Sequence, residues 1–281
     1  MSAPGTLAMV RLFARQELVL AVRSRWTPIF AVVFAALALG VGFSGYIVTG
    51  GFGMQDFART AVSLVQLVLL LVPLTALLIG VMALAPERGA AELLFAQPVP
   101  RATVLVGKLV GLFEALAAAQ LIGFGAAGLT VFSQAGETGA GGFLLMVAGS
   151  LALTAIFLGI AALISVGNVG RRARALAIAL VVWFVAVVLF DVAVLGVATL
   201  LRSGHASRLL VTAVIVNPVD AVRTGTLLGI EGSAAFGAAS LAFFRITGGS
   251  TAAAAYLLVS VGAWLVVPTV LAVRRLERAD L

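Results

Sequence analysis

Six long apolar blocks constrain this chain more than any other feature of its sequence. They cover residues 27–48, 60–84, 103–132, 143–167, 175–201 and 251–273. Each block reaches the roughly 20 residues that a helix needs to cross the hydrocarbon core of a bilayer. Because backbone polar groups find no water in lipid, such blocks cross it as α-helices. With 62% hydrophobic and only 10% charged residues, residues 1–281 are predicted to form a single all-α integral membrane domain.

The Lys and Arg residues predict how these six helices are oriented. With both termini in the cytoplasm, thirteen of the eighteen basic residues lie on the inner side, as the positive-inside rule requires. They are Arg11, Arg15, Arg23, Arg25, Arg88, Arg101, Lys108, Arg171, Arg172, Arg174, Arg274, Arg275 and Arg278. We therefore expect a multi-pass protein of the cytoplasmic (inner) membrane, N-in and C-in. The same rule explains the net charge of +7, so nucleic acid is not an expected partner.

Residues 6–26 precede the first block and are too charged to cross a membrane. Apolar Leu7, Val10 and Leu18 recur there at helical spacing, with arginines in another sector. This pattern predicts an amphipathic helix that lies in the lipid interface. Glu17 is an exception, since it falls on the apolar side of the helix.

A short charged segment, residues 85–103, separates the second and third blocks and is the strongest candidate for contact with another protein. It combines acids, arginines and an apolar ridge between Pro86 and Pro98, which predicts a short amphipathic helix bounded by prolines. We predict that this segment docks on a cytoplasmic partner through Glu87, Arg88, Glu92, Leu93, Leu94, Pro98 and Arg101.

The fifth and sixth blocks are joined by a long outer segment, residues 202–250. Within it, residues 209–216 and 225–244 are apolar, and we interpret both as helices lying on or dipping into the outer face. Polar and turn-forming residues gather between and within them: Asn217, Pro218, Asp220, Arg223 and Glu231. Asn-Pro and the following Asp are typical of a turn that starts a helix. Contact with a protein outside the membrane is the alternative for these five residues.

Two acids lie inside the predicted spans, Glu114 in the third and Asp191 in the fifth. A carboxylate at membrane depth costs several kcal/mol unless it is paired, hydrated or protonated. Each acid either lines a translocation path or forms a structural ion pair with a neighbouring span or an outer-loop arginine. Gln66 and Gln120 indicate hydrogen bonds between helices. Glycines crowd the third and fourth spans, either for close helix packing or as a matter of composition: Gly111, Gly123, Gly125, Gly128, Gly149 and Gly159.

The sequence lacks the residues of a catalytic or metal centre. There is no cysteine and His205 is the only histidine, so neither a thiolate metal site nor a nucleophilic triad is expected. No phosphate-binding loop of the Walker type occurs either. We expect no metal, no cofactor and no enzymatic activity in this chain, and any ATP and Mg²⁺ must be held by a partner.

Several motifs in the first half resemble the permease half of an ABC-2 type exporter. They are Ala14-Arg15-Gln16-Glu17-Leu18, Arg23-Ser24-Arg25-Trp26, Glu87-Arg88-Gly89, Glu92-Leu93-Leu94, Gln97-Pro98-Val99-Pro100-Arg101 and Gly107-Lys108. Later motifs resemble the NosY family, the permeases of the NosDFY transporter that matures nitrous oxide reductase in denitrification. These are Trp183-Phe184, Phe190-Asp191, Asn217-Pro218-Val219-Asp220 with Arg223, and Gly229-Ile230-Glu231-Gly232. Gln16 departs from that family, which more often has a lysine there.

The resemblance implies a homodimeric permease with an ATPase partner (NosF-like) on residues 85–103 and an extracytoplasmic β-helical partner (NosD-like). It further implies export of a sulfur species, or mechanical signalling, for assembly of the reductase's copper–sulfur centre. A general ABC-2 exporter of a drug, lipid or ion is the first alternative. An ATP-independent channel or scaffold is the second.

Overall fold

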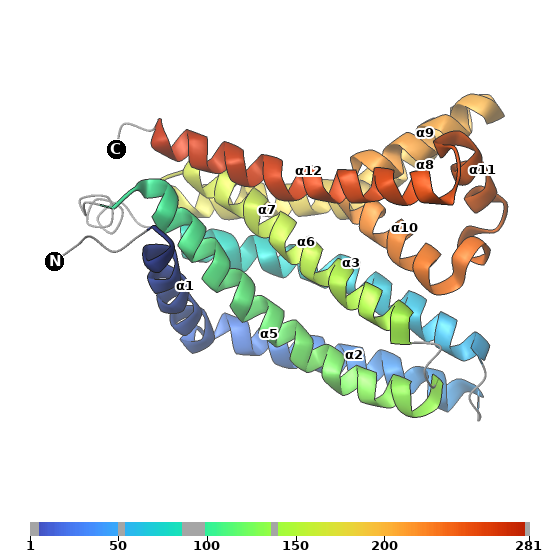
Figure 1. The fold of residues 1–281 in the computed structure, drawn as a ribbon, viewed down its shortest axis with the longest axis horizontal. Helices are drawn as coiled ribbons and strands as arrows, with labels where there is room; N and C mark the ends of the chain where they lie inside the picture. Colours follow the sequence, from blue (N-terminus) through green and yellow to red (C-terminus); the bar gives the residue numbers. More distant parts are fainter. Residues whose placement is uncertain (1–5, 50–53, 86–98, 136–139, 279–281) are drawn as a thin grey trace.

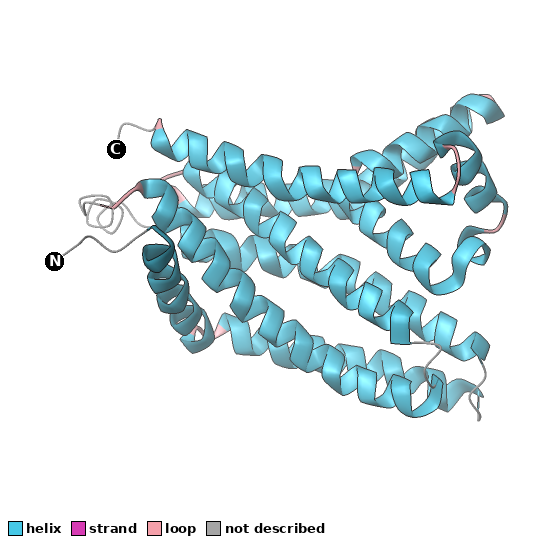
Figure 2. Cartoon of the chain, viewed as in Figure 1, coloured by secondary structure: helices cyan, strands magenta, loops and turns pink. Residues whose placement is uncertain are grey.

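Helices build the whole of the described structure. The computed structural model describes residues 6–49, 54–85, 99–135 and 140–278, and every regular element in these ranges is helical (Figure 2). In chain order these elements are α1 (Thr6–Arg23), α2 (Trp26–Thr49), α3 (Met54–Leu84), α5 (Arg101–Ala135), α6 (Ala140–Val166), α7 (Arg172–Phe184), the π-helical turn η2 (Val185–Leu189), α8 (Phe190–Leu200), α9 (Ser203–Val216), α10 (Pro218–Glu231), the 3₁₀ turn η3 (Gly232–Phe236), α11 (Ala238–Thr247) and α12 (Ser250–Glu277).

Each of the six predicted apolar blocks coincides with a helix. The blocks correspond to α2, α3, α5, α6, the continuous run α7–η2–α8, and α12. By length and composition, five helical stretches in the described residues can cross a membrane: α3, α5, α6, α7–η2–α8 and α12. Two further pairs, α1–α2 and α9–α10, qualify only when each pair is taken together, and they are bent by 67° and 100°. The chain is therefore a multi-pass membrane protein with five to seven candidate spans.

The long helices run back and forth between two ends of an elongated bundle (Figure 1). At one end, here named the termini end, α1 begins, α3 ends, α5 and α7 begin, and α12 ends. At the opposite end, here named the hairpin end, α8 leads into α9, and α10 leads through η3 into α11 (Figure 1). The helix pair α9–α10 therefore enters and leaves the bundle from the same end.

The core lies where α3, α5 and α6 pack together. Its fully buried side chains include Leu77, Leu116 and Phe157, and Gly80 allows α3 to approach Ala161 of α6 closely. Gln120 of α5 is buried there as well, and its amide binds the hydroxyls of Ser150 and Thr154 on α6 at 2.7 and 2.6 Å. The predicted interhelical role of Gln120 is confirmed, whereas the side chain of Gln66 is exposed on α3.

Helix α1 packs against the first turns of α5. A Cβ added at Gly107 would lie 2.6 Å from the Cβ of Phe13, and one at Gly111 would overlap the carbonyl oxygen of Ala14. Only glycines at these two positions let the helices meet this closely. The contact also explains the acid on the apolar side of α1, since the carboxylate of Glu17 lies 3.3 Å from the ammonium of Lys108 on α5.

The apolar stretch 225–244 was predicted to form one helix, and this prediction is wrong. Helix α10 ends at Glu231, and α11 starts only at Ala238. Gly232 and Gly237 adopt φ values of 63° and 53°, which are unfavourable for residues with a Cβ and which break the helical path. The segment 202–250 is thus a set of short helices, and the first part of α10 is buried inside the bundle.

Candidate functional site

Polar contacts join five helices at the termini end: α1, α3, α5, α7 and α12. The guanidinium of Arg172, in the first turn of α7, donates to the carbonyl oxygen of Met82 in the last turn of α3 at 2.7 Å. Carbonyls of a last helical turn have no partner within the helix, and a cation there also complements the helix dipole. Arg101, the first residue of α5, donates to the carbonyl of Leu276 on α12 at 3.5 Å. The ends of α3 and α5 are therefore tied to α7, α12 and, through Lys108, α1.

These helix ends flank the segment predicted to dock on a partner. Of its predicted contact residues, Glu87, Arg88, Glu92, Leu93, Leu94 and Pro98 lie outside the described residues. Arg101 is described and half-buried. Along the chain, the segment follows the end of α3 and precedes the start of α5. A force applied to the segment would therefore reach both helices.

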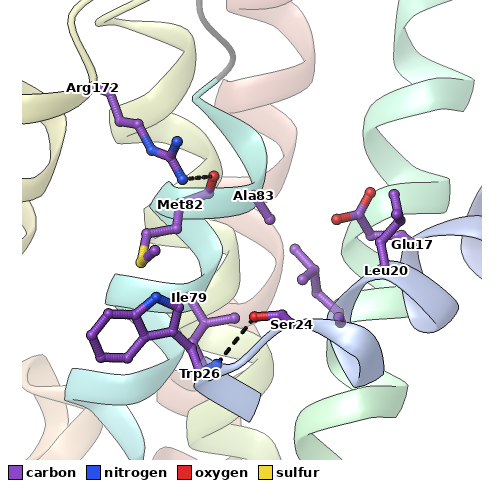
Figure 3. A pocket seen from close by; sticks show the side chains of 10 residues that line it. Glu17, Leu20, Ser24, Trp26, Ile79, Met82, Ala83 and Arg172 are labelled. Carbon is purple, nitrogen blue, oxygen red and sulfur yellow. Dashed lines mark hydrogen bonds between the residues drawn. The ribbon is translucent and has the colours of Figure 1, made fainter.

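A pocket of about 190 Å³ opens beside these contacts (Figure 3). It lies at the bend between α1 and α2, and Met82, Ala83 and Ile79 of α3 line one side of it. Arg172 reaches the same space from α7. The pocket thus borders both the interfacial helix and the last turn of α3.

A second polar cluster lies where α10 begins. The side chain of Asn217 caps α10 by accepting from the backbone N–H of Val219 at 3.1 Å, which confirms the predicted helix start. Its amide group also donates to a carboxylate oxygen of Asp220 at 3.0 Å and to the carbonyl of Ala186 in η2 at 2.9 Å. One side chain therefore holds α10 against the fifth apolar block.

The ion pairs of this cluster link the same two elements. One guanidinium nitrogen of Arg223 lies 2.9 Å from the carboxylate of Asp191 on α8, and the other lies 2.8 Å from that of Asp220. Of the two roles predicted for Asp191, the structure shows the ion pair with an outer-segment arginine. Its side chain stays 33% exposed and that of Arg223 stays 26% exposed, so the pair also reaches the surface of this single chain.

The other residues predicted in the outer segment and in the spans are placed differently. Asn217, Pro218 and Asp220 are buried inside the bundle instead of standing on an outer surface. Glu231 ends α10 and is half-buried. Glu114 is exposed on α5 and forms no ion pair with a residue that the structure describes.

Two side chains that were not predicted as functional residues hold the tip of the α9–α10 pair. Ser260 and Trp264 of α12 donate to the carbonyls of Ile215 and Val216, with the Trp264 bond at 2.8 Å. These carbonyls end α9, where the helix itself offers them no partner, and the N–H of Val219, which would reach Ile215 in a continued helix, binds the side chain of Asn217 instead. A signal existed in the sequence, because Trp264 lies inside an apolar block and away from its ends, where interfacial tryptophans gather.

The run α7–η2–α8 is barely covered by the rest of the chain. Only 6% of its most apolar 18-residue stretch is buried in the structure, against 56% of the corresponding stretches in α3, α5 and α6. Asp191 lies on this run. A surface that carries a charged pair at membrane depth is unfavourable against lipid.

Comparisons with known proteins agree with these features. Residues 12–281 match the model of the family described as ABC-2 family transporter protein. Two curated proteins, each named "Probable ABC transporter permease protein NosY", are similar over most of their length. The one from Pseudomonas aeruginosa is 34% identical over 242 residues, covering 84% of this chain and 88% of its own. The one from Stutzerimonas stutzeri is 36% identical over 238 residues, covering 81% and 85%.

Proposed function

Because this chain belongs to the ABC-2 transporter family and is a permease subunit, we propose that it couples ATP hydrolysis on a separate subunit to maturation of the copper–sulfur centre of nitrous oxide reductase. It does so by exporting a sulfur species or by transmitting a mechanical signal. The similarity to two proteins named NosY favours this role in maturation over general export. The observation that carries the coupling role is the series of polar contacts that runs from the last turn of α3 to the start of α10.

The proposed topology has six spans with both termini in the cytoplasm. Support comes from the arginines of α1, α7 and α12, which gather at the termini end. The pair α9–α10 enters and leaves from the hairpin end, so it is a re-entrant pair and leaves the parity of the spans unchanged. Irregular backbone at membrane depth is tolerated where protein satisfies it, as Asn217, Ser260 and Trp264 do here.

The ATPase partner (NosF-like), which holds ATP and Mg²⁺, docks on residues 85–103. Its movement pulls on the last turn of α3, and Arg172 passes that displacement to α7 through its bond to Met82. The run α7–η2–α8 then carries it to Ala186 and Asp191, which are bonded to Asn217 and Arg223 of α10. Such a route needs a bistable element as well as contacts, and the re-entrant pair is the element that we assign to it.

Beyond α10, the same displacement reaches η3 and α11 at the hairpin end. There the extracytoplasmic β-helical partner (NosD-like) receives it. Asn217 and Asp220 are buried, so they act inside the bundle: Asn217 holds α10 to Ala186 of η2, and Asp220 pairs with Arg223, which binds Asp191 of α8. The partner is contacted by residues farther along, such as Glu231.

The permease works as a homodimer. The barely covered run α7–η2–α8, with its partly exposed Asp191–Arg223 pair, is the surface that a second copy would cover. A protein or aqueous neighbour would remove the cost of facing this pair to lipid.

The test replaces Glu87 and Glu92 by alanine in the full-length chain, co-expressed with the ATPase in a strain that lacks its own NosY-type permease. We expect membrane insertion to persist, while permease-stimulated ATPase activity and formation of the reductase's copper–sulfur centre are lost. Glu277→Ala, an exposed acid at the same end, is the matched control and should retain both.

Three outcomes would redirect the proposal. Unchanged ATPase stimulation in the double variant removes the docking role of residues 85–103. A wild-type permease that retains the ATPase but does not restore the copper–sulfur centre is a general exporter. A permease that never retains an ATPase is a channel or scaffold.

A further inference from the structure

The pocket between α1, α2, α3 and α7, here named the elbow pocket, carries a second inference that requires only that the chain lies in a bilayer. Its lining combines one cation, one acid, one hydroxyl, the aromatic side chain of Trp26 and an apolar wall. Arg172 is the cation and Ser24 the hydroxyl. The apolar wall comprises Leu20, Ala21, Ile79, Met82, Ala83 and Leu112.

The polar groups of the elbow pocket retain donors after their internal bonds are counted. A guanidinium has five N–H donors, and Arg172 uses one nitrogen for the carbonyl of Met82. The hydroxyl of Ser24 accepts from the backbone N–H of Trp26 at 3.2 Å, which leaves its own proton for another acceptor. The one acid in the lining, Glu17, has its charge offset by Lys108 at 3.3 Å. The pocket therefore presents donors to a ligand that is an acceptor.

The position of the pocket matches the boundary between headgroups and acyl chains. It lies at the bend between the amphipathic helix α1 and the apolar helix α2. Trp26, at this bend, is 56% exposed, as is typical of an aromatic residue at the membrane interface. Leu20 and Val22 of α1 are exposed beside it. Arg23 and Arg25 are exposed at the same bend, which adds positive charge around the opening.

We propose that the elbow pocket binds the phosphate headgroup of an anionic phospholipid. The phosphate oxygens accept from Arg172 and Ser24, and the first acyl carbons pack on the apolar wall. Basic pockets between membrane helices bind anionic headgroups by this combination of charge and burial. The apolar wall and the exposed Leu20 favour a lipid over free phosphate, which would leave them without a partner.

A bound lipid would also act on the end of α3. Met82 and Ala83 belong to the last turn of α3, directly before residues 86–98. A phosphate on Arg172 would hold that guanidinium in place against the carbonyl of Met82. The lipid thereby fixes the position of the last turn of α3.

The experiment measures lipid retention by native mass spectrometry. The full-length permease is reconstituted with equal amounts of phosphatidylglycerol and phosphatidylcholine, extracted in mild detergent and analysed for bound lipid. We expect the wild type to prefer phosphatidylglycerol by about fivefold, the effect of one interfacial cation. Arg172→Gln should abolish this preference. Arg174→Gln, an exposed arginine two residues along the same helix, should leave it unchanged.

A second pair of variants separates lipid binding from the structural role of Arg172. Ala83→Leu fills the pocket without touching a charge and should also abolish the preference, whereas Arg172→Lys keeps the cation and should retain part of it. Equal preference in the wild type, Arg172→Gln and Ala83→Leu overturns the proposal. A second measurement follows the heat-denaturation midpoint of the permease with added inorganic phosphate or added phosphatidylglycerol. If inorganic phosphate alone raises the midpoint as much as phosphatidylglycerol does, the choice of a lipid as the ligand is overturned.

Discussion

Replacing Arg223 by glutamine should destabilise the permease far more than replacing Asp191 by asparagine, although the two residues form one ion pair. The reason is the charge count of the cluster, in which one guanidinium serves two carboxylates at 2.9 and 2.8 Å. Asp191→Asn leaves the balanced pair of Arg223 and Asp220. Arg223→Gln leaves two carboxylates on either side of a neutral amide.

The exposure of the three side chains sets the magnitudes. Asp191 and Arg223 are 33% and 26% exposed, so the loss of Asp191 should cost about 1 kcal/mol, near the upper value for exposed pairs. The side chain of Asp220 is only 5% exposed, so removing the guanidinium that serves it should cost about 3 kcal/mol, the lower value for a broken buried pair. The double variant Asp191→Asn/Arg223→Gln leaves one carboxylate without its cation instead of two, so it should be about 1 kcal/mol more stable than Arg223→Gln alone.

The assay heats the purified full-length permease in detergent and follows the monodisperse fraction by size-exclusion chromatography. At about 2–4 °C for each kcal/mol in a chain of this size, the midpoint should fall by about 2–4 °C in Asp191→Asn and by about 6–12 °C in Arg223→Gln. Arg208→Gln, an exposed arginine on α9, is the control and should shift the midpoint by less than about 1 °C. The charge count is refuted if the midpoint of Arg223→Gln lies at or above that of Asp191→Asn. It is also refuted if the midpoint of Asp191→Asn/Arg223→Gln lies below that of Arg223→Gln alone.

Two further predictions concern helix packing and the tip of the re-entrant pair. Gly111→Ala places a Cβ against the carbonyl of Ala14, so it should push α1 off α5 and lower the heat-denaturation midpoint by several degrees. Gly125→Ala is the control, because its added Cβ meets nothing within 4 Å and should leave the midpoint unchanged. Equal midpoints for the two variants would contradict the α1–α5 contact. Trp264→Phe replaces the indole by a phenyl ring and removes the donor to the carbonyl of Val216. It should therefore cost about 1–2 kcal/mol of stability and speed hydrogen exchange of the backbone at the end of α9. Unchanged exchange would mean that this bond does not hold the tip.

The sequence predicted the helices well because the signal for them is local. Every apolar block is a helix, and Asn217 starts α10 as its Asn-Pro pair indicates. What it could not predict is the pairing between distant residues. Glu17 looked misplaced on α1 because its partner, Lys108, lies on α5, and the choice between a path residue and an ion pair for Asp191 depended on how residues 202–250 fold back.

The glycines illustrate the same limit. From the sequence, Gly111, Gly123 and Gly125 were equally good candidates for close helix packing. In the structure, an added Cβ at Gly111 or Gly123 would meet α1 or Phe34 of α2, and one at Gly125 would meet nothing within 4 Å. A helical glycine is a packing residue only if another helix crosses it, and the crossing points follow from the tertiary arrangement.

The bonds from α12 to the tip of the re-entrant pair also set an order of assembly. Ser260 and Trp264 lie on the last helix of the chain, whereas the carbonyls of Ile215 and Val216 that they bind end α9. A chain is synthesised from its N-terminus, so α9 and α10 leave the ribosome before their donors exist. Seating of the pair must therefore wait for the C-terminal helix, which makes this step the one that closes the fold.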